Sequence, residues 1–158
     1  MAKKQLPEDF KEFIQCLNRN RVKYLLLGGW AVGIYGQPRA TKDIDFLISK
    51  DDKNLKKLKK ALIEFSSPPV ELDGFKEDGF VVRMGSPPIL IDIINKASGI
   101  DINDCYNRRK KIKIENINVS VISLDDLIIN KKASGRGQDA VDAEKLENIR
   151  DDLIYTHN

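Results

Sequence analysis

The chain has 158 residues, of which 41% are hydrophobic and 32% charged, and its net charge is +3 at neutral pH. About 150 residues is a common length for one compact domain, and this composition excludes a disordered chain. No apolar run approaches the roughly 20 residues of a membrane-spanning helix. The first residues also lack the apolar stretch that is typical of a signal peptide. Two separated cysteines form no disulfide framework. We therefore expect one domain over 1–158, with no membrane as partner, in a reducing, cytoplasmic setting.

Hydrophobic spacing and turn residues predict a series of short helices and strands. In chain order these are a helix at 7–19, a strand at 22–27, a helix at 30–35, a strand at 44–48, a helix at 53–65, strands at 80–84 and 89–94, strands at 111–115 and 117–122, and helices at 123–132 and 138–154. This mixture predicts an α+β fold, an α/β sandwich with a small mixed β-sheet flanked by helices. The core is expected at about 22–122, followed by a helical C-terminal segment at 123–154.

Two carboxylates share one face of the second predicted strand. Side chains alternate along a strand, so Asp43 and Asp45 point to the same side, with Cα atoms roughly 7 Å apart. Their like charges repel unless a cation lies between them, and Mg²⁺ or Mn²⁺ takes carboxylate oxygens as ligands. The alternative is an acidic pair at the solvent edge of a strand.

A third carboxylate, Asp92, lies in the run Ile89–Ile94, which is apolar on both faces. Such a strand is covered on both sides, so an unpaired carboxylate there would cost on the order of several kcal/mol. Its partner is either an arginine or lysine, or Asp92 joins Asp43 and Asp45 in a three-carboxylate site. A site of that kind suits two metal ions that clamp an in-line phosphoryl displacement.

A glycine pair, Gly28-Gly29, stands between the first predicted strand and the helix that follows it. Glycine permits a positive φ and a close approach of the backbone, and a helix N-terminus presents free N–H groups to a phosphate. Taken alone, the pair also fits an ordinary turn.

Leu27-Gly28-Gly29-Trp30, with thirteen residues from Trp30 to Lys42 and then Asp43-Ile44-Asp45-Phe46, resembles the signature of the DNA polymerase β-like nucleotidyltransferase superfamily. The likeness is to small prokaryotic members: minimal, antibiotic and abortive-infection toxin-like nucleotidyltransferases. The tail 127–133, followed by Arg136, Asp139 and Asp142, is similar to the C-terminal helical segment of that family. The resemblance spans about 22–146.

This resemblance implies a nucleotidyltransferase fold and a metal-dependent transfer of an NMP group from an NTP, such as ATP, to an acceptor hydroxyl, with release of pyrophosphate. It implies that Asp43, Asp45 and Asp92 are the catalytic residues and bind Mg²⁺ or Mn²⁺, with Asp92 also the general base. It implies that Gly28 and Gly29 hold the triphosphate.

Further candidate nucleotide-binding residues lie in two places. Arg39, Thr41 and Lys42 precede the carboxylate pair, where the alternative is an exposed polar turn. Lys131 and Arg136 lie in the tail, where they would neutralise a triphosphate or, alternatively, stabilise the end of a helix.

The alternative function is a catalytically silent binding or regulatory module of the same fold, such as one component of a toxin–antitoxin pair. The expected partners of the enzyme are an NTP and an acceptor that the sequence does not identify: a small molecule such as an antibiotic, an RNA end or a protein hydroxyl. Little chain after residue 123 is left for an acceptor domain, so a homodimer or a cognate toxin or antitoxin partner also fits.

Overall fold

A computed structural model of the chain describes residues 6–36, 41 and 43–156. In chain order its elements are α1 (Glu8–Arg19), β1 (Tyr24–Leu27), α2 (Gly28–Tyr35), β2 (Asp43–Ile48), α3 (Asp52–Glu64), β3 (Val81–Ser86), β4 (Ile89–Ile94), α4 (Ile102–Cys105), β5 (Lys110–Ile114), β6 (Ile117–Val121), α5 (Leu124–Ser134) and α6 (Gly137–Thr156), with 3₁₀ turns at Asp73–Lys76 and Tyr106–Arg108. Every predicted helix and strand is present, with its ends shifted by a few residues. The short helix α4 and the two 3₁₀ turns are not predicted from the sequence.

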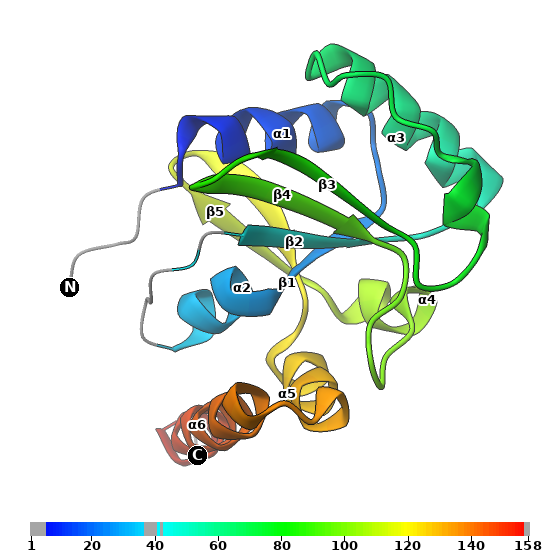
Figure 1. Cartoon of the computed structure of the whole chain (residues 1–158). Helices are drawn as coiled ribbons and strands as arrows, with labels where there is room; N and C mark the ends of the chain where they lie inside the picture. Colours follow the sequence, from blue (N-terminus) through cyan, green and yellow to red (C-terminus); the bar gives the residue numbers. More distant parts are fainter. Residues whose placement is uncertain (1–5, 37–40, 42, 157–158) are drawn as a thin grey trace.

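Within the described residues, the strands form one six-stranded sheet in the order β3-β4-β2-β1-β6-β5. The pairs β2–β4 and β1–β6 are parallel, whereas β1–β2, β3–β4 and β5–β6 are antiparallel. Helices α1 and α3 lie on one side of this sheet, and α2, α5 and α6 lie on the other (Figure 1). The expectation of an α+β sandwich with a mixed sheet and a helical C-terminus is confirmed.

The hydrophobic core determines which way β2 faces. Ile44, Phe46 and Ile48 are buried, and Phe13 of α1 packs edge-on against Phe46 with ring centroids 5.4 Å apart. Because side chains alternate along a strand, the acidic residues of β2 point to the opposite side of the sheet. That is the side on which α2, α5 and α6 lie (Figure 1).

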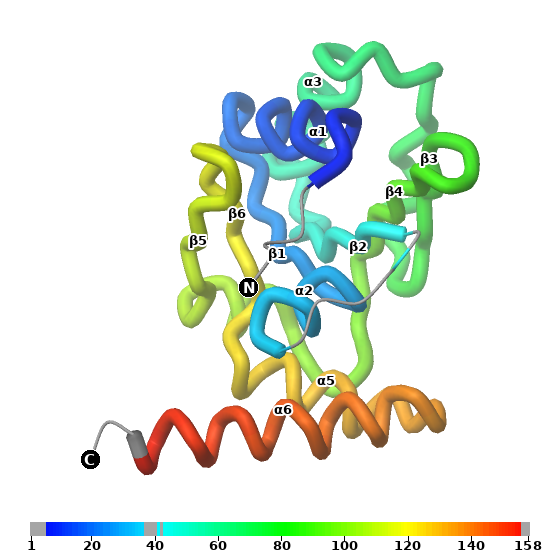
Figure 2. The backbone as a smooth tube through the Cα atoms, turned by 90° about the vertical axis from the view of Figure 1, so that its left-hand side faces the viewer, coloured from blue at the N-terminus to red at the C-terminus, as the bar shows by residue number. Residues whose placement is uncertain are grey.

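The two C-terminal helices form an antiparallel pair beneath this second face. Ser123 caps α5, since its hydroxyl accepts a hydrogen bond from the backbone N–H of Asp126 at 3.1 Å. Gly135 ends α5 with a φ of +69°, a left-handed conformation that glycine adopts without strain. Figure 2 shows α6 crossing the molecule on the side away from α1 and α3, with its C-terminal end extending past the sheet. None of the described helices is long and apolar enough to span a membrane.

Asn95, at the end of β4, holds the segment that leads into β3. Its side-chain oxygen accepts hydrogen bonds from two backbone N–H groups, and its side-chain NH₂ donates to two backbone carbonyls. The four partners are Gly79 at 2.9 Å, Phe80 at 3.2 Å, Phe75 at 2.8 Å and Glu77 at 2.6 Å. One buried amide therefore saturates four backbone groups of a loop that would otherwise be loosely attached.

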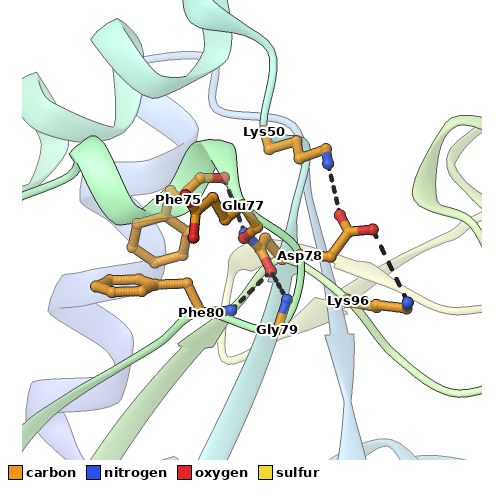
Figure 3. Close-up of polar contacts among 8 residues, drawn as sticks. Lys50, Phe75, Glu77, Asp78, Gly79, Phe80 and Lys96 are labelled. Carbon is orange, nitrogen blue, oxygen red and sulfur yellow. Dashed lines mark hydrogen bonds and ion pairs between the residues drawn. The ribbon is translucent and has the colours of Figure 1, made fainter.

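Beside this amide, Asp78 lies between two lysines, Lys50 and Lys96, and forms an ion pair with each (Figure 3). These contacts tie the loop to the C-terminal ends of β2 and β4. The start of β3 is thereby fixed against β4, in a register that sets Arg83 opposite Asp92.

Candidate active site

Three carboxylates lie in a row across two adjacent strands. In the parallel pair β2–β4, Asp45 is the direct Cα partner of Asp92, and Asp43 is the partner of Leu90. Neighbouring strands lie about 4.8 Å apart, and directly paired residues point to the same face. The structure thus brings together the three carboxylates that the sequence singles out.

A residue that the sequence analysis does not single out, Arg83 of β3, extends this row. Its Nε donates to Oδ1 of Asp92 at 2.7 Å and its Nη2 to Oδ2 of Asp92 at 2.9 Å. The same Nη2 donates to Oδ2 of Asp43 at 3.2 Å. The counter-charge of Asp92 in this structure is therefore an arginine, the first of the two alternatives, and Asp92 also lies next to Asp45 in the sheet.

The sequence contains a signal for Arg83. The two-residue turn at Pro87-Pro88 pairs Ser86 with Ile89, and three residues further along each strand the same register pairs Arg83 with Asp92. Cross-strand partners on one face are the natural place to look for the counter-charge of a buried carboxylate.

Asp45 lies between the other two carboxylates, and the negative charges of both act on its pKa. Burial raises the pKa of Asp45 to about 6, and the negative charges of Asp92 and Asp43 act in the same direction. The ammonium group of Lys131 acts in the opposite direction. Burial and the neighbouring negative charges therefore act together to disfavour the ionised form of Asp45.

Gly28 lies directly against this carboxylate. Its φ is +65°, and a Cβ at this position would lie 2.2 Å from Oδ2 of Asp45. Both features require glycine. Gly28 and Gly29 are also the first residues of α2, so the free N–H groups of that helix begin beside the carboxylate row.

Lys131 connects the C-terminal helices to the row. It is buried on α5, and its Nζ lies 3.0 Å from Oδ1 of Asp139 and 3.4 Å from Oδ2 of Asp142, both on α6. Ser134 donates a second hydrogen bond to Asp139 at 2.5 Å. Since the charge of Lys131 also favours the ionised form of Asp45, α5 and α6 together hold one cation within electrostatic reach of the row.

The remaining predicted nucleotide-binding residues are placed differently. The hydroxyl of Thr41 donates to the backbone carbonyl of Asp43 at 3.2 Å, at the entry to β2. Arg39 and Lys42 fall outside the described residues. Arg136 is exposed in the link between α5 and α6, so the structure does not bring its side chain into the carboxylate row.

The donor chemistry of the row suits a hard divalent cation, because carboxylate oxygens are the ligands that Mg²⁺ and Mn²⁺ take. The raised pKa of Asp45 points the same way, since a further positive charge would relieve it. As the side chains lie here, no group of three or more acidic, histidine or cysteine side chains in the described part of the chain is arranged to hold an ion. The positive charge beside Asp43 and Asp92 is the guanidinium of Arg83.

Comparison with known proteins gives a family and a fold. Residues 4–151 match the family model described as a nucleotidyltransferase of unknown function (DUF6036). No curated protein matches the chain.

Three similar solved structures each cover more than nine-tenths of the chain. The lincosamide antibiotic adenylyltransferase LnuA with lincomycin bound has a TM-score of 0.54 at 14% identity, covering 93% of this chain and 99% of its own. ANT(2″)-Ia in complex with adenylyl-2″-tobramycin has a TM-score of 0.54 at 16% identity, covering 94% and 97%. An antigenic nucleotidyltransferase-like protein from Paracoccidioides brasiliensis has a TM-score of 0.51 at 17% identity, covering 92% and 78%. At these identities the likeness establishes a shared fold.

Proposed function

The chain belongs to the DUF6036 family of nucleotidyltransferases, and we propose that it transfers an NMP group from an NTP to an acceptor hydroxyl, releasing pyrophosphate. The observation that carries this proposal is the direct pairing of Asp45 with Asp92 on parallel strands, with Gly28 against Asp45. That pairing concentrates carboxylates beside the N-terminus of a helix, which is the combination that a metal-bound triphosphate requires.

In the proposed mechanism, Asp43, Asp45 and Asp92 would hold Mg²⁺ or Mn²⁺ in a two-metal arrangement. The bound ions would supply Lewis-acid stabilisation of the charge that develops on the transferred phosphoryl group. Asp92 accepts the proton of the acceptor hydroxyl while that oxygen attacks the α-phosphorus. The bond from the α-phosphorus to the bridging oxygen breaks, and pyrophosphate leaves with the electron pair.

The remaining groups of the site would bind the triphosphate. The first N–H groups of α2, at Gly28 and Gly29, have no partner within the helix and would donate to phosphate oxygens. Lys131, held by Asp139 and Asp142, would contribute a positive charge, which already acts on Asp45. We propose Arg39, Thr41 and Lys42 as further nucleotide contacts from their positions in the chain.

The test is transfer of label. The full chain is incubated with each of the four α-labelled NTPs, Mg²⁺ and a panel of acceptors that contains aminoglycosides, lincosamides, RNA and protein. We expect pyrophosphate release and label on one acceptor class, with both abolished in Asp45→Asn while the circular dichroism spectrum is unchanged. Full activity of D45N, or no labelled product with any NTP and acceptor, would overturn the proposal. A small-molecule hydroxyl enters the panel because two similar structures hold an antibiotic or its adenylylated form.

One observation favours the alternative of a catalytically silent binding module, such as one component of a toxin–antitoxin pair. Arg83 forms ion pairs with two of the three carboxylates that a metal would need. A silent module would bind an NTP or a protein partner without releasing pyrophosphate, so the same assay separates the two functions. Size-exclusion chromatography with light scattering would show whether the chain forms a homodimer, which a shared acceptor surface would require.

A further inference from the structure

We infer that Arg83 is an internal counter-cation that competes with a divalent metal ion for Asp43 and Asp92, so that metal binding requires the guanidinium to leave the row. This inference rests on the proposed function only in that the same three carboxylates take the ion. It assigns to Arg83 a control over the metal affinity of the site.

The geometry defines the competition. Arg83 occupies both carboxylate oxygens of Asp92, at 2.7 and 2.9 Å, and one of Asp43, at 3.2 Å. A metal ion shared by the same two residues would need oxygens that now accept hydrogen bonds from Arg83. The N–H groups of a guanidinium and a divalent metal ion cannot both occupy the same carboxylate lone pairs, and the two cations repel one another at that distance.

Arg83 is the member of this cluster that can move. Its side chain is 56% exposed, whereas that of Asp92 is 9% exposed. Asp92 lies on β4, which has a neighbour on each side, while Arg83 extends from the edge strand β3. An arginine with half its surface in water regains hydration when it leaves, so its pairing contributes only modestly to stability.

The arginine also explains how the carboxylate row can exist before an ion binds. Asp45 and Asp92 are direct cross-strand partners, and like charges placed opposite one another destabilise a sheet. Arg83 supplies positive charge at the outer side of the row and Lys131 acts on Asp45 from α5. Removal of Arg83 should therefore have two opposite effects: a less stable metal-free protein and a tighter metal complex.

This pair of effects separates the inference from two simpler roles. A purely structural ion pair would lower stability when removed and leave metal affinity unchanged. An arginine that only orients Asp92 as a ligand would weaken metal binding when removed. Of the three roles, only competition predicts that the metal affinity increases when Arg83 is removed.

The experiment measures Mn²⁺ binding to the full chain by electron paramagnetic resonance of the free ion. It compares the wild type with Arg83→Gln, Arg83→Lys and the control Arg19→Gln. Arg19 is 55% exposed and pairs with Glu64 on the α1–α3 side of the sheet, so it matches Arg83 in exposure and charge but not in place. We expect R83Q to bind Mn²⁺ on the order of five- to tenfold more tightly, R83K to fall between, and R19Q to match the wild type.

Thermal unfolding gives the second readout. In EDTA, R83Q should melt at a lower temperature than the wild type, and saturating Mn²⁺ should reduce or reverse that difference. R83K retains a positive charge without the two-point pairing. If R83Q does not fold, the Mn²⁺ affinity of R83K is compared with that of the wild type instead.

Equal or weaker Mn²⁺ binding by folded R83Q or R83K would overturn the inference, as would no Mn²⁺ binding by any variant. Nucleotidyl transfer by the wild type is scored separately. Transfer with unchanged Mn²⁺ affinity in R83Q would remove the inference and leave the proposed function standing. Tighter Mn²⁺ binding without transfer to any acceptor would support the inference and remove the proposed function.

Discussion

The backbone of Gly28 and the carboxylate of Asp45 are in direct contact, with an added Cβ at residue 28 falling 2.2 Å from Oδ2 of Asp45. The antiparallel pairing of β1 with β2 creates this contact, because it sets Leu27, the residue before Gly28, opposite Asp45. The glycine and the acidic pair are well separated in the sequence motif, but the pairing of β1 with β2 brings them into contact. The chain between them leaves β1, forms α2 and returns to start β2.

Replacement of Gly28 by alanine tests whether this contact shapes the site. Gly135→Ala is the matched control, because the two glycines have φ values of +65° and +69°, and nothing lies within 4 Å of a Cβ at residue 135. Both variants should lose about 1–2 kcal/mol from the left-handed conformation. Only G28A should lose more and bind Mn²⁺ more weakly, because Asp45 must move. Urea unfolding and Mn²⁺ titration would check this, and equal losses of stability with equal Mn²⁺ affinity would contradict it.

A second prediction concerns the buried cation of the C-terminal helices. Lys131→Met should leave Asp139 and Asp142 buried without their shared counter-charge, a change that typically costs about 3–5 kcal/mol. Lys132→Met is the control, because Lys132 is 59% exposed and pairs with Glu147 at the surface, and such pairs contribute at most about 1 kcal/mol.

Urea unfolding of both lysine variants would measure the difference. If the lost charge pairing is the cause, adding Asp139→Asn and Asp142→Asn to K131M should recover part of the stability, since buried neutral amides need no counter-ion. Comparable destabilisation by K131M and K132M would contradict the buried network as the reason.

The strands and the carboxylate face of β2 could be predicted because they follow from local patterns. Alternation alone sets Asp43 and Asp45 on one face, and the apolar setting of Asp92 requires a partner. The order of the strands could not be predicted in the same way, because the placement of β4 beside β2 depends on packing between distant segments. The family resemblance implied a metal-binding role for Asp92, and the direct pairing of Asp45 with Asp92 became visible only in the sheet.

Arg83 was missed for a different reason. A strand with an arginine at an exposed position looks like any amphipathic edge strand, and the pairing of Arg83 with Asp92 depends on the register set by the turn at Pro87-Pro88. Asp139 and Asp142 were seen only as part of a tail motif. Their role as partners of Lys131 requires the reversal of the chain at Gly135, which brings α6 back against α5.

The third prediction follows from the pKa of Asp45 and its sign. Burial, with the charges of Asp92 and Asp43, raises this pKa to about 6, whereas an unfolded aspartate has a pKa of about 4. Between these values the folded protein binds more protons than the unfolded chain, so this group lowers the free energy of unfolding as pH rises through about 4 to 6. Asp45→Asn keeps the shape and removes the charge. In EDTA it should therefore be more stable than the wild type at pH 7, by roughly 1–3 kcal/mol, with the difference vanishing near pH 4.

Asp51 supplies a control of opposite sign. The hydrogen bond from Ser49 lowers the pKa of Asp51, which also caps α3 by accepting from the N–H of Asn54. A carboxyl of lowered pKa stabilises the fold above its unfolded pKa, and that contribution is lost as pH falls through the folded pKa. Asp51→Asn should accordingly be less stable than the wild type at pH 7, and the deficit should shrink in acid. Urea unfolding at about pH 3 and about pH 7 measures both variants, and a shift of the same sign for D45N and D51N at pH 7 would contradict the raised pKa of Asp45.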